Sequence, residues 1–239
     1  MRIMNRAPIH RGELHHTIKN NYIMMNKKFV FLLAIAISVM SAGYGQEINF
    51  SKYGIETKDI HIPQGLKVGD KAPDFTGYDQ KGKMVESKKL LEKGPMILFF
   101  YRGKWCPVCS RYLSNYQDSL NLITDQGFNF VAITPESIEN VEQTVKLHNL
   151  SFTVIYDCQE KIMKDYDVIF NVTKAYQDKI LTTLSTDIAK NNGRDAARLP
   201  VPATYIINRE GIIVAVNFDP NYQNRATVKW MLLNLASAL

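Results

Sequence analysis

Two cysteines separated by two residues are the side chains of this 239-residue chain whose type and spacing most clearly suggest chemistry. Cys106 and Cys109 follow an apolar run, residues 95–101, that has the length and composition of a buried strand. Beyond them, apolar side chains recur at the spacing of a helix predicted to run to about Gln126: Leu113, Tyr116, Leu120 and Ile123. The pair therefore lies where a buried strand turns into a helix.

The position of Cys106 at the start of this helix favours a thiolate. Pro107 suits the first helical turn, where no N–H group is needed. A thiol there faces unpaired backbone N–H groups and the positive end of the helix dipole. Arg102 and Lys104 add positive charge nearby. We therefore predict Cys106 as the nucleophile and Cys109, one turn further along, as the resolving thiol.

Other interpretations of the cysteine pair are less well supported. A structural zinc site needs about four ligands, and the remaining candidates, Cys158, His61 and His148, have no recognisable spacing. An inert structural disulfide is the second alternative, and it would be possible in a protein that is exported. The Trp-Cys-Pro-x-Cys motif lies between a predicted strand and a predicted helix, and this context favours redox chemistry over both alternatives. We therefore expect no metal site. We expect His148 to end a helix and Cys158 to be a packed structural thiol, with a third redox thiol as the alternative.

Four segments of the chain carry a family resemblance. They are residues 100–109 (FYRGKWCPVC), 68–75 (VGDKAPDF), 199–208 (LPVPATYIIN) and 219–222 (DPNY) with Arg225 after it. Together they resemble the alkyl hydroperoxide reductase and thiol-specific antioxidant (AhpC/TSA) family, in its peroxiredoxin-like branch that carries Cys-x-x-Cys. The resemblance extends from about Leu66 to the end of the sequence. It implies a thioredoxin-like α/β fold: a central mixed β-sheet flanked by helices, with an N-terminal hairpin and an insertion before a cis-proline strand.

The resemblance also implies where a substrate binds. It makes the Val201–Pro202 bond a cis peptide that faces the cysteine pair. A cis proline exposes the backbone of the preceding residue, so Val201 would pair with an extended substrate peptide. Trp105 would form part of the groove wall, with simple packing as the alternative. The predicted substrate-binding residues are thus Trp105, Val201 and Pro202.

The sequence departs from the patterns of both parent groups. Peroxiredoxins place a threonine or serine three residues before the reactive cysteine, and here Gly103 or Cys106 stands there, depending on which cysteine is aligned. Thioredoxins carry a buried carboxylate in the strand before the motif, and Phe99 and Phe100 fill that region. No arginine is fixed near Cys106 by sequence alone, and the group that takes the proton of the second thiol is unassigned.

We therefore predict an enzyme, a thiol:disulfide oxidoreductase that exchanges or reduces disulfides. It needs no cofactor other than a redox-active Cys106–Cys109 disulfide. Its expected partners are protein or small-molecule disulfides and thiols. The alternative is a thiol-dependent peroxidase, an antioxidant that acts on peroxide. A copper or metal carrier on the same fold is the third hypothesis.

The N-terminal region predicts export. Residues 25–28 form a positive segment, residues 29–40 are apolar, and residues 41–45 supply small side chains for cleavage before Gln46. The apolar stretch is shorter than the roughly 20 residues of a membrane span, so we expect no stable membrane anchor, with a retained anchor as the alternative. Residues 1–24 are interpreted as an upstream extension and residues 25–45 as a signal peptide. The predicted location is periplasmic.

The charge of the chain supports no nucleic-acid partner. The net charge is +6, and the first 45 residues hold six basic side chains against one acidic side chain. The region after the predicted cleavage site is therefore almost neutral, which excludes a basic binding surface as its main feature.

The remaining chain is expected to form a lead-in segment, residues 46–65, and one domain, residues 66–239. Strands and helices alternate, as in an α/β sandwich. Further strands are predicted at residues 75–78, 84–85, 128–133, 152–156, 204–207 and 212–217, and further helices at residues 87–92, 138–148, 157–166 and 225–238. Asp157 and Glu160 are interpreted as a capping box. Residues 170–198 form the predicted insertion, with one or two short amphipathic helices.

Overall fold

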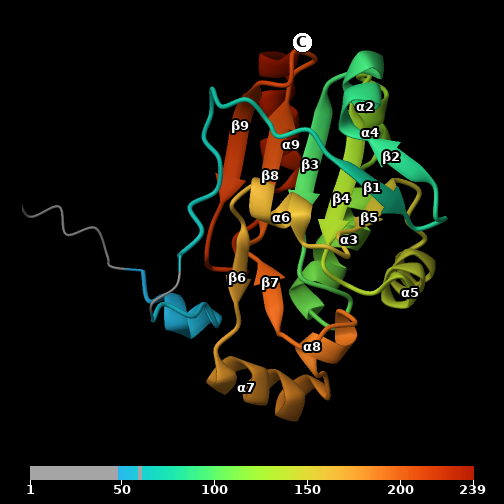
Figure 1. Cartoon of the computed structure of the whole chain (residues 1–239). Helices are drawn as coiled ribbons and strands as arrows, with labels where there is room; N and C mark the ends of the chain where they lie inside the picture. The colour runs from blue at the N-terminus through green and yellow to red at the C-terminus, as the bar shows by residue number, and fades with distance from the viewer. Residues whose placement is uncertain (1–47, 59–60) are drawn as a thin grey trace, which may run out of the picture. The chain divides into compact units, whose positions relative to one another are not determined.

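The apolar run ahead of the cysteine pair forms the central strand β3 (Met96–Phe100), and all five of its side chains are buried. β3 pairs in parallel with β4 (Asn129–Thr134) and antiparallel with β8 (Ala203–Ile207). Its position in the middle of the sheet explains why the run is apolar on both faces. The computed structural model describes residues 48–58 and 61–239, and Figure 1 shows their arrangement.

Seven strands form one mixed sheet in the order β2-β1-β5-β4-β3-β8-β9. The other members are β1 (Thr76–Asp79), β2 (Met84–Glu86), β5 (Thr153–Tyr156) and β9 (Ile213–Phe218). β1 and β2 make the predicted N-terminal hairpin, and β8 and β9 make a second hairpin. β3, β4 and β5 are parallel, so their carboxyl ends meet at one edge of the sheet, the edge that carries the cysteine pair.

Helices cover both faces of the sheet, as expected for a thioredoxin-like fold. They are α2 (Ser87–Lys93), α3 (Pro107–Asp118), α4 (Asn121–Thr124), α5 (Ile138–His148), α6 (Lys161–Asp165) and α9 (Val228–Asn234), with 3-10 turns η1 (Phe50–Tyr53) and η2 (Leu235–Ala238). Alternate side chains of β3 point to opposite faces. Ile97 and Phe99 join a core with residues of α3, α5 and α9, and Met96 and Leu98 join a second core with residues of α6.

The predicted insertion forms a layer with a core of its own. It contains the two-stranded sheet of β6 (Ile169–Asn171) and β7 (Arg198–Pro200), and the helices α7 (Lys174–Leu184) and α8 (Ile188–Asn191). We name its buried cluster the insertion core: Ile55, Phe170, Val172, Tyr176, Ile180, Ile188, Ala197, Leu199 and Val201. Ile55 enters it through an isolated bridge to Val172, so the segment before residue 66 also contributes. The predicted domain boundary at residue 66 stays a prediction.

The predicted helix to Gln126 is interrupted. α3 ends at Asp118, and α4 begins only at Asn121. Ser119 leaves the helical conformation with ψ 8°, and its N–H group donates to the carbonyl of Gln117. The sequence pattern did not reveal the break, because Leu120 and Ile123 join the same buried cluster as the apolar side chains of α3 and so keep the helical spacing of apolar residues.

The predicted capping box at Asp157 is wrong. α6 begins after Glu160, which has a positive φ of 56° and gives no side-chain cap. The Glu160 carboxylate instead accepts a hydrogen bond from Arg198 Nε at 3.0 Å. Asp157 accepts from the backbone N–H of Met163 at 2.8 Å, one turn further along than a capping box would require.

The last helix is also shorter than expected. It begins at Val228, because Thr227 is its N-cap and accepts from the N–H of Trp230. Over the described part of the chain, no helix is long and apolar enough to cross a membrane. The upstream extension (residues 1–24) and the signal peptide (residues 25–45) lie outside the described residues.

Candidate active site

Cys106 and Cys109 lie together at the start of α3, at the carboxyl end of β3. Cys106 is the N-cap residue, and the backbone N–H of Cys109 donates to its Sγ atom at 3.4 Å. Pro107 occupies the first helical turn, as predicted. Both thiols are free, and each cysteine is only 1% exposed. The structure therefore brings the predicted pair together and keeps both sulfur atoms away from bulk water.

Two arginines contact the pair, one on each sulfur. Arg102 Nη2 lies 2.9 Å from Cys106 Sγ. Arg225 Nη2 lies 3.4 Å from Cys109 Sγ, and its Nε donates to the carbonyl of Tyr222 at 2.8 Å. Guanidinium groups at these distances favour a negative charge on sulfur.

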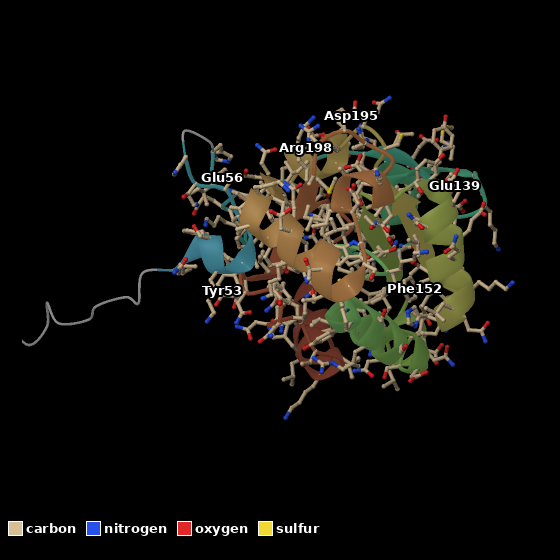
Figure 2. All side chains as sticks on the ribbon, turned by 90° about the horizontal axis from the view of Figure 1, so that it is seen from below. Tyr53, Glu56, Glu139, Phe152, Asp195 and Arg198 are labelled. Carbon is tan, nitrogen blue, oxygen red and sulfur yellow. The ribbon has the colours of Figure 1, made fainter. Side chains whose placement is uncertain are left out.

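Three aromatic rings, Trp105, Tyr176 and Tyr222, surround Arg102 and are named here the aromatic box. The guanidinium carbon lies 3.7 Å from the ring centre of Tyr222, 5.2 Å from Trp105 and 6.0 Å from Tyr176. These are distances at which a cation is attracted to an aromatic face. Tyr176, from α7, also accepts a hydrogen bond from Arg102 Nη1 at 2.8 Å. Figure 2 views this end of the molecule and shows α7 across it, with η1 and Tyr53 beside it.

The two thiols differ in acidity. Burial raises the pKa of Cys109, but the hydrogen bond from Cys106 and the charges of Arg225 and Arg102 outweigh it and hold this pKa well below its usual value. The hydrogen bond with Cys109, burial and the negative charge of Cys109 raise the pKa of Cys106. The pair thus loses one proton readily and the second with difficulty. This order is the reverse of the sequence prediction, because the Cys106 thiol donates a hydrogen bond to Cys109 and Arg225 reaches Cys109 from a distant segment.

Glu136 is a functional candidate that the sequence analysis missed. It follows β4, is 1% exposed, and accepts the N–H of Lys104 at 2.8 Å and the side-chain amide of Asn191 at 3.2 Å. Burial raises its pKa to about 7, and the charge of Cys109 adds to this effect. The available signal was an acidic residue just after a buried strand, at the edge where parallel strands end.

Gly103 allows this carboxylate to approach the loop before the cysteines. Its φ is +144°, a conformation that favours glycine. A Cβ atom there would lie 2.9 Å from Glu136 Oε1 and 2.7 Å from Trp105 Nε1. Both distances are too short for any side chain, so the indole and the carboxylate depend on a glycine between them.

The expected cis peptide is not found. The Val201–Pro202 bond is trans, and none of the peptide bonds within the described residues is cis. Val201 is 1% exposed, belongs to the insertion core, and donates its N–H to the carbonyl of Val168 at 2.7 Å. That N–H is therefore already used within the protein. Of the three predicted substrate-binding residues, Trp105 adjoins Arg102. Val201 and Pro202 are buried, Val201 in the insertion layer and Pro202 beside it. The substrate-binding role of all three stays a prediction.

The remaining sequence candidates lie outside this site. Cys158 is exposed, so the prediction of a packed thiol is wrong; the chain leaves β5 with Asp157, not Cys158, turned inward. His148 ends α5 as expected, 3.0 Å from Ser114 Oγ. His61 pairs with Asp167 at 2.6 Å. Within residues 48–58 and 61–239, no group of three or more histidine, cysteine or acidic residues is arranged to hold a metal ion.

Comparison with known proteins gives the family. The profile of the AhpC/TSA family matches residues 68–216. The thiol-disulfide oxidoreductase ResA of Bacillus cereus (strain ATCC 10987 / NRS 248) is 26% identical over 156 residues, which is 65% of this chain and 85% of the relative. The chloroplastic peroxiredoxin Q of Sedum lineare is 30% identical over 164 residues, which is 67% of this chain and 75% of the relative.

Solved structures show the same fold. The peroxidoxin BcpB from Mycobacterium tuberculosis superposes with a TM-score of 0.58 at 18% identity, covering 73% of this chain and 99% of that one. The peroxiredoxin-like protein from Aquifex aeolicus gives 0.56 at 15% identity, covering 74% and 91%. Family profile, relatives and fold agree, and this chain belongs to the AhpC/TSA family as an oxidoreductase of thioredoxin-like fold.

Proposed function

We propose that the chain is a thiol:disulfide oxidoreductase whose Cys106 and Cys109 alternate between a dithiol and a disulfide. The observation that carries this proposal is the pair at the start of α3, with the Cys109 N–H 3.4 Å from Cys106 Sγ and an arginine on each sulfur. The similarity to ResA, named a thiol-disulfide oxidoreductase, supports it. The disulfide itself is the redox group, and no further cofactor is needed.

The chemistry proceeds in two exchange steps. Cys106, the N-cap residue beside the exposed Pro107, attacks a substrate disulfide as its proton passes along the side-chain hydrogen bond from its thiol to the sulfur of Cys109. A mixed disulfide forms, and the first substrate sulfur leaves as a thiolate and takes a proton from water. Cys109 then attacks Cys106, forming the intramolecular disulfide and releasing the second substrate sulfur. Two electrons pass from the protein to the substrate, and the reverse sequence oxidises a dithiol.

Glu136 is the proposed acceptor for the proton that Cys109 must lose before the second step. It is buried near the pair, and its pKa of about 7 suits a group that takes up and returns a proton at neutral pH. Glu136, in the turn after β4, would thereby take the role of the carboxylate that thioredoxins carry in the strand before the motif.

Trapping of intermediates tests the proposal. The reduced Cys109→Ser chain should accumulate mixed disulfides with insulin, because the resolving thiol is absent. Cys106→Ser should trap few. The reverse pattern would assign the nucleophile to Cys109, as its lower pKa would suggest. Failure of the reduced chain to reduce insulin or a small disulfide, together with failure of the oxidised chain to oxidise a dithiol, would refute the proposed activity.

Thiol-dependent peroxide reduction is the second candidate. The two arginines favour it, because they supply positive charge where a peroxide oxygen would become negative, in place of the missing threonine. A thiolate would attack one peroxide oxygen and become a sulfenic acid, while the O–O bond breaks and the other oxygen takes a proton and leaves as water. The other thiol would then condense with the sulfenic acid to a disulfide and a second water. Stopped-flow oxidation by hydrogen peroxide decides between the candidates. A rate several orders of magnitude above that of a free thiol, lost in Cys106→Ser or Cys109→Ser, would establish the peroxidase.

The third hypothesis, a copper or metal carrier, has a direct test. Near-stoichiometric copper(I) that survives dialysis, together with no exchange activity, would favour it over both redox proposals.

We further propose that the chain is exported to the periplasm and acts on protein or small-molecule disulfides and thiols there, with peroxide as substrate under the second candidate. The pattern of residues 25–45 supports export. The mature chain should begin near Gln46, without a stable membrane anchor and without a nucleic-acid partner. Intact-mass measurement from the native host tests this, and a soluble species that retains Met1 or Met25 would overturn it.

A further inference from the structure

Arg102 is a buried cation without a carboxylate partner. Its exposed fraction is 2%, and none of the ion pairs formed by the described residues includes it. Its hydrogen bonds go to Cys106 Sγ and to the hydroxyl of Tyr176, and its Nε has no partner. A guanidinium keeps its proton in a protein, and a buried charge without a counter-ion is strongly destabilising. The anion available to Arg102 is the cysteine pair, which shares one negative charge: the guanidinium contacts Cys106 Sγ, and its charge also helps to lower the pKa of Cys109.

The surroundings of Arg102 fix it in this position. The ring of Tyr222 lies 3.7 Å from the guanidinium carbon on one side, and Trp105 and Tyr176 enclose it further. The aromatic faces compensate part of the charge. Arg225 differs, because it is half-buried and can exchange its sulfur contact for water. Arg102 is therefore the arginine whose free energy depends most on the state of the sulfur atoms.

The two redox states of the pair carry different charges. The reduced pair loses one proton more readily than an ordinary thiol, because an arginine lies on each sulfur and the pKa of Cys109 is held well below its usual value, and it then carries one negative charge. In the disulfide both sulfurs are neutral, and Arg102 keeps only the Tyr176 hydroxyl and the aromatic box. We propose that Arg102 makes the Cys106–Cys109 couple oxidising, so that electrons flow from partner dithiols into this protein. This inference rests on the proposed exchange activity and specifies the direction in which electrons flow.

The electron balance of that direction is simple. A partner dithiol loses two electrons and two protons and becomes a disulfide, and the Cys106–Cys109 bond takes the two electrons. One proton stays on the reduced pair, the other passes to water, and the remaining thiolate restores the counter-ion of Arg102.

The test is the equilibrium of the full chain with reduced and oxidised glutathione at neutral pH, read by alkylation and intact mass. Arg102→Met should shift the equilibrium constant at least tenfold toward the disulfide, and each factor of ten corresponds to 29.6 mV. Arg225→Met should shift it less. Arg111→Met is the matched control, because Arg111 is an exposed residue of α3 that stacks on Tyr112 and contacts neither sulfur. Its equilibrium should equal that of the unaltered chain.

A second variant moves the equilibrium the other way. Tyr176→Phe keeps the ring and the charge of Arg102 but removes the hydroxyl that accepts from Nη1. The disulfide form depends more on that hydroxyl, so we expect a shift of a few-fold toward the dithiol. If Arg102→Met and Tyr176→Phe shift the equilibrium in opposite directions, the cause is charge compensation and not general structural damage. If Arg102→Met does not fold, the shift in Tyr176→Phe is the test.

Two results would overturn the inference, and they differ. If the chain forms the disulfide but these variants leave the equilibrium unchanged, or shift it with the opposite signs, Arg102 does not set the direction. If the unaltered chain forms no Cys106–Cys109 disulfide with excess diamide, the proposed exchange function fails first, and the inference with it.

Discussion

Burial of Glu136 makes the stability of the protein depend on pH. The pKa of this carboxyl is raised from 4.5 to about 7 by burial, so the folded state binds its proton more tightly than the unfolded chain. Below about pH 4.5 the carboxyl is protonated in both states, and folding bears no cost for its charge. As the pH rises to about 7, the unfolded chain ionises first, and the folded state loses roughly 3 kcal/mol, because one pKa unit is about 1.4 kcal/mol.

Glu136→Gln removes this dependence. Glutamine keeps an oxygen that accepts from the N–H of Lys104 and never ionises. The free energy of unfolding of the variant, minus that of the unaltered chain, should therefore rise by roughly 3 kcal/mol between about pH 4.5 and about pH 8. Urea unfolding of the reduced proteins at a series of pH values measures it. Glu142→Gln is the matched control, because that carboxylate is exposed on α5, the helix that follows the same turn.

A flat difference between Glu136→Gln and the unaltered chain would refute the reasoning, as would a difference that falls with rising pH. Either result would mean that water or a cation compensates the carboxylate in the folded state, and Glu136 would lose its proposed role as the proton acceptor.

Three other measurements follow from the same contacts. Gly103→Ala should destabilise the fold by about 2 kcal/mol or more, since it adds strain at a positive φ and a clash with the buried carboxylate; Gly82→Ala, also at positive φ but with nothing within 4 Å, should cost less in the same urea assay. Alkylation of the folded, reduced protein should label Cys158 before Cys106 and Cys109, because only Cys158 is exposed; equal rates would contradict the burial of the pair. Ultraviolet absorbance should detect one thiolate that titrates below the usual range of a thiol and disappears in Cys109→Ser, because the pKa of Cys109 is lowered, and its persistence in that variant would place the charge on Cys106.

The fold was predictable where local pattern and burial agree. The apolar run of β3 and the periodic side chains of α5 gave their elements directly, because each is decided by which faces are buried. The start of α6 was not predictable in this way. Glu160 had the right spacing for a capping box, but the guanidinium of Arg198, 38 residues away, takes its carboxylate.

The residues of the site also differ in whether local sequence could predict them. Cys106 and Cys109 could be found because strand, motif and helix are adjacent in sequence. Arg225 lies 116 residues from the sulfur it contacts, and Tyr176 lies 74 residues from Arg102. Such contacts depend on how the insertion and the last loop pack, and no local pattern encodes them. The cis peptide at Val201 was inferred from resemblance alone, and here the pairing with Val168 holds the chain differently.

The insertion core has a consequence for access to the sulfur atoms. It is a cluster separate from the two cores of the main sheet, and Trp105 and Phe218 are the partly buried side chains it shares with them. Layers with their own small core open by local unfolding at a lower free energy than the whole domain. α7 and α8 supply Tyr176 and Asn191 to the site, so their opening uncovers it while the central sheet stays intact. The frequency of that opening, and not the stability of the domain, would then limit how fast a folded protein substrate meets the dithiol.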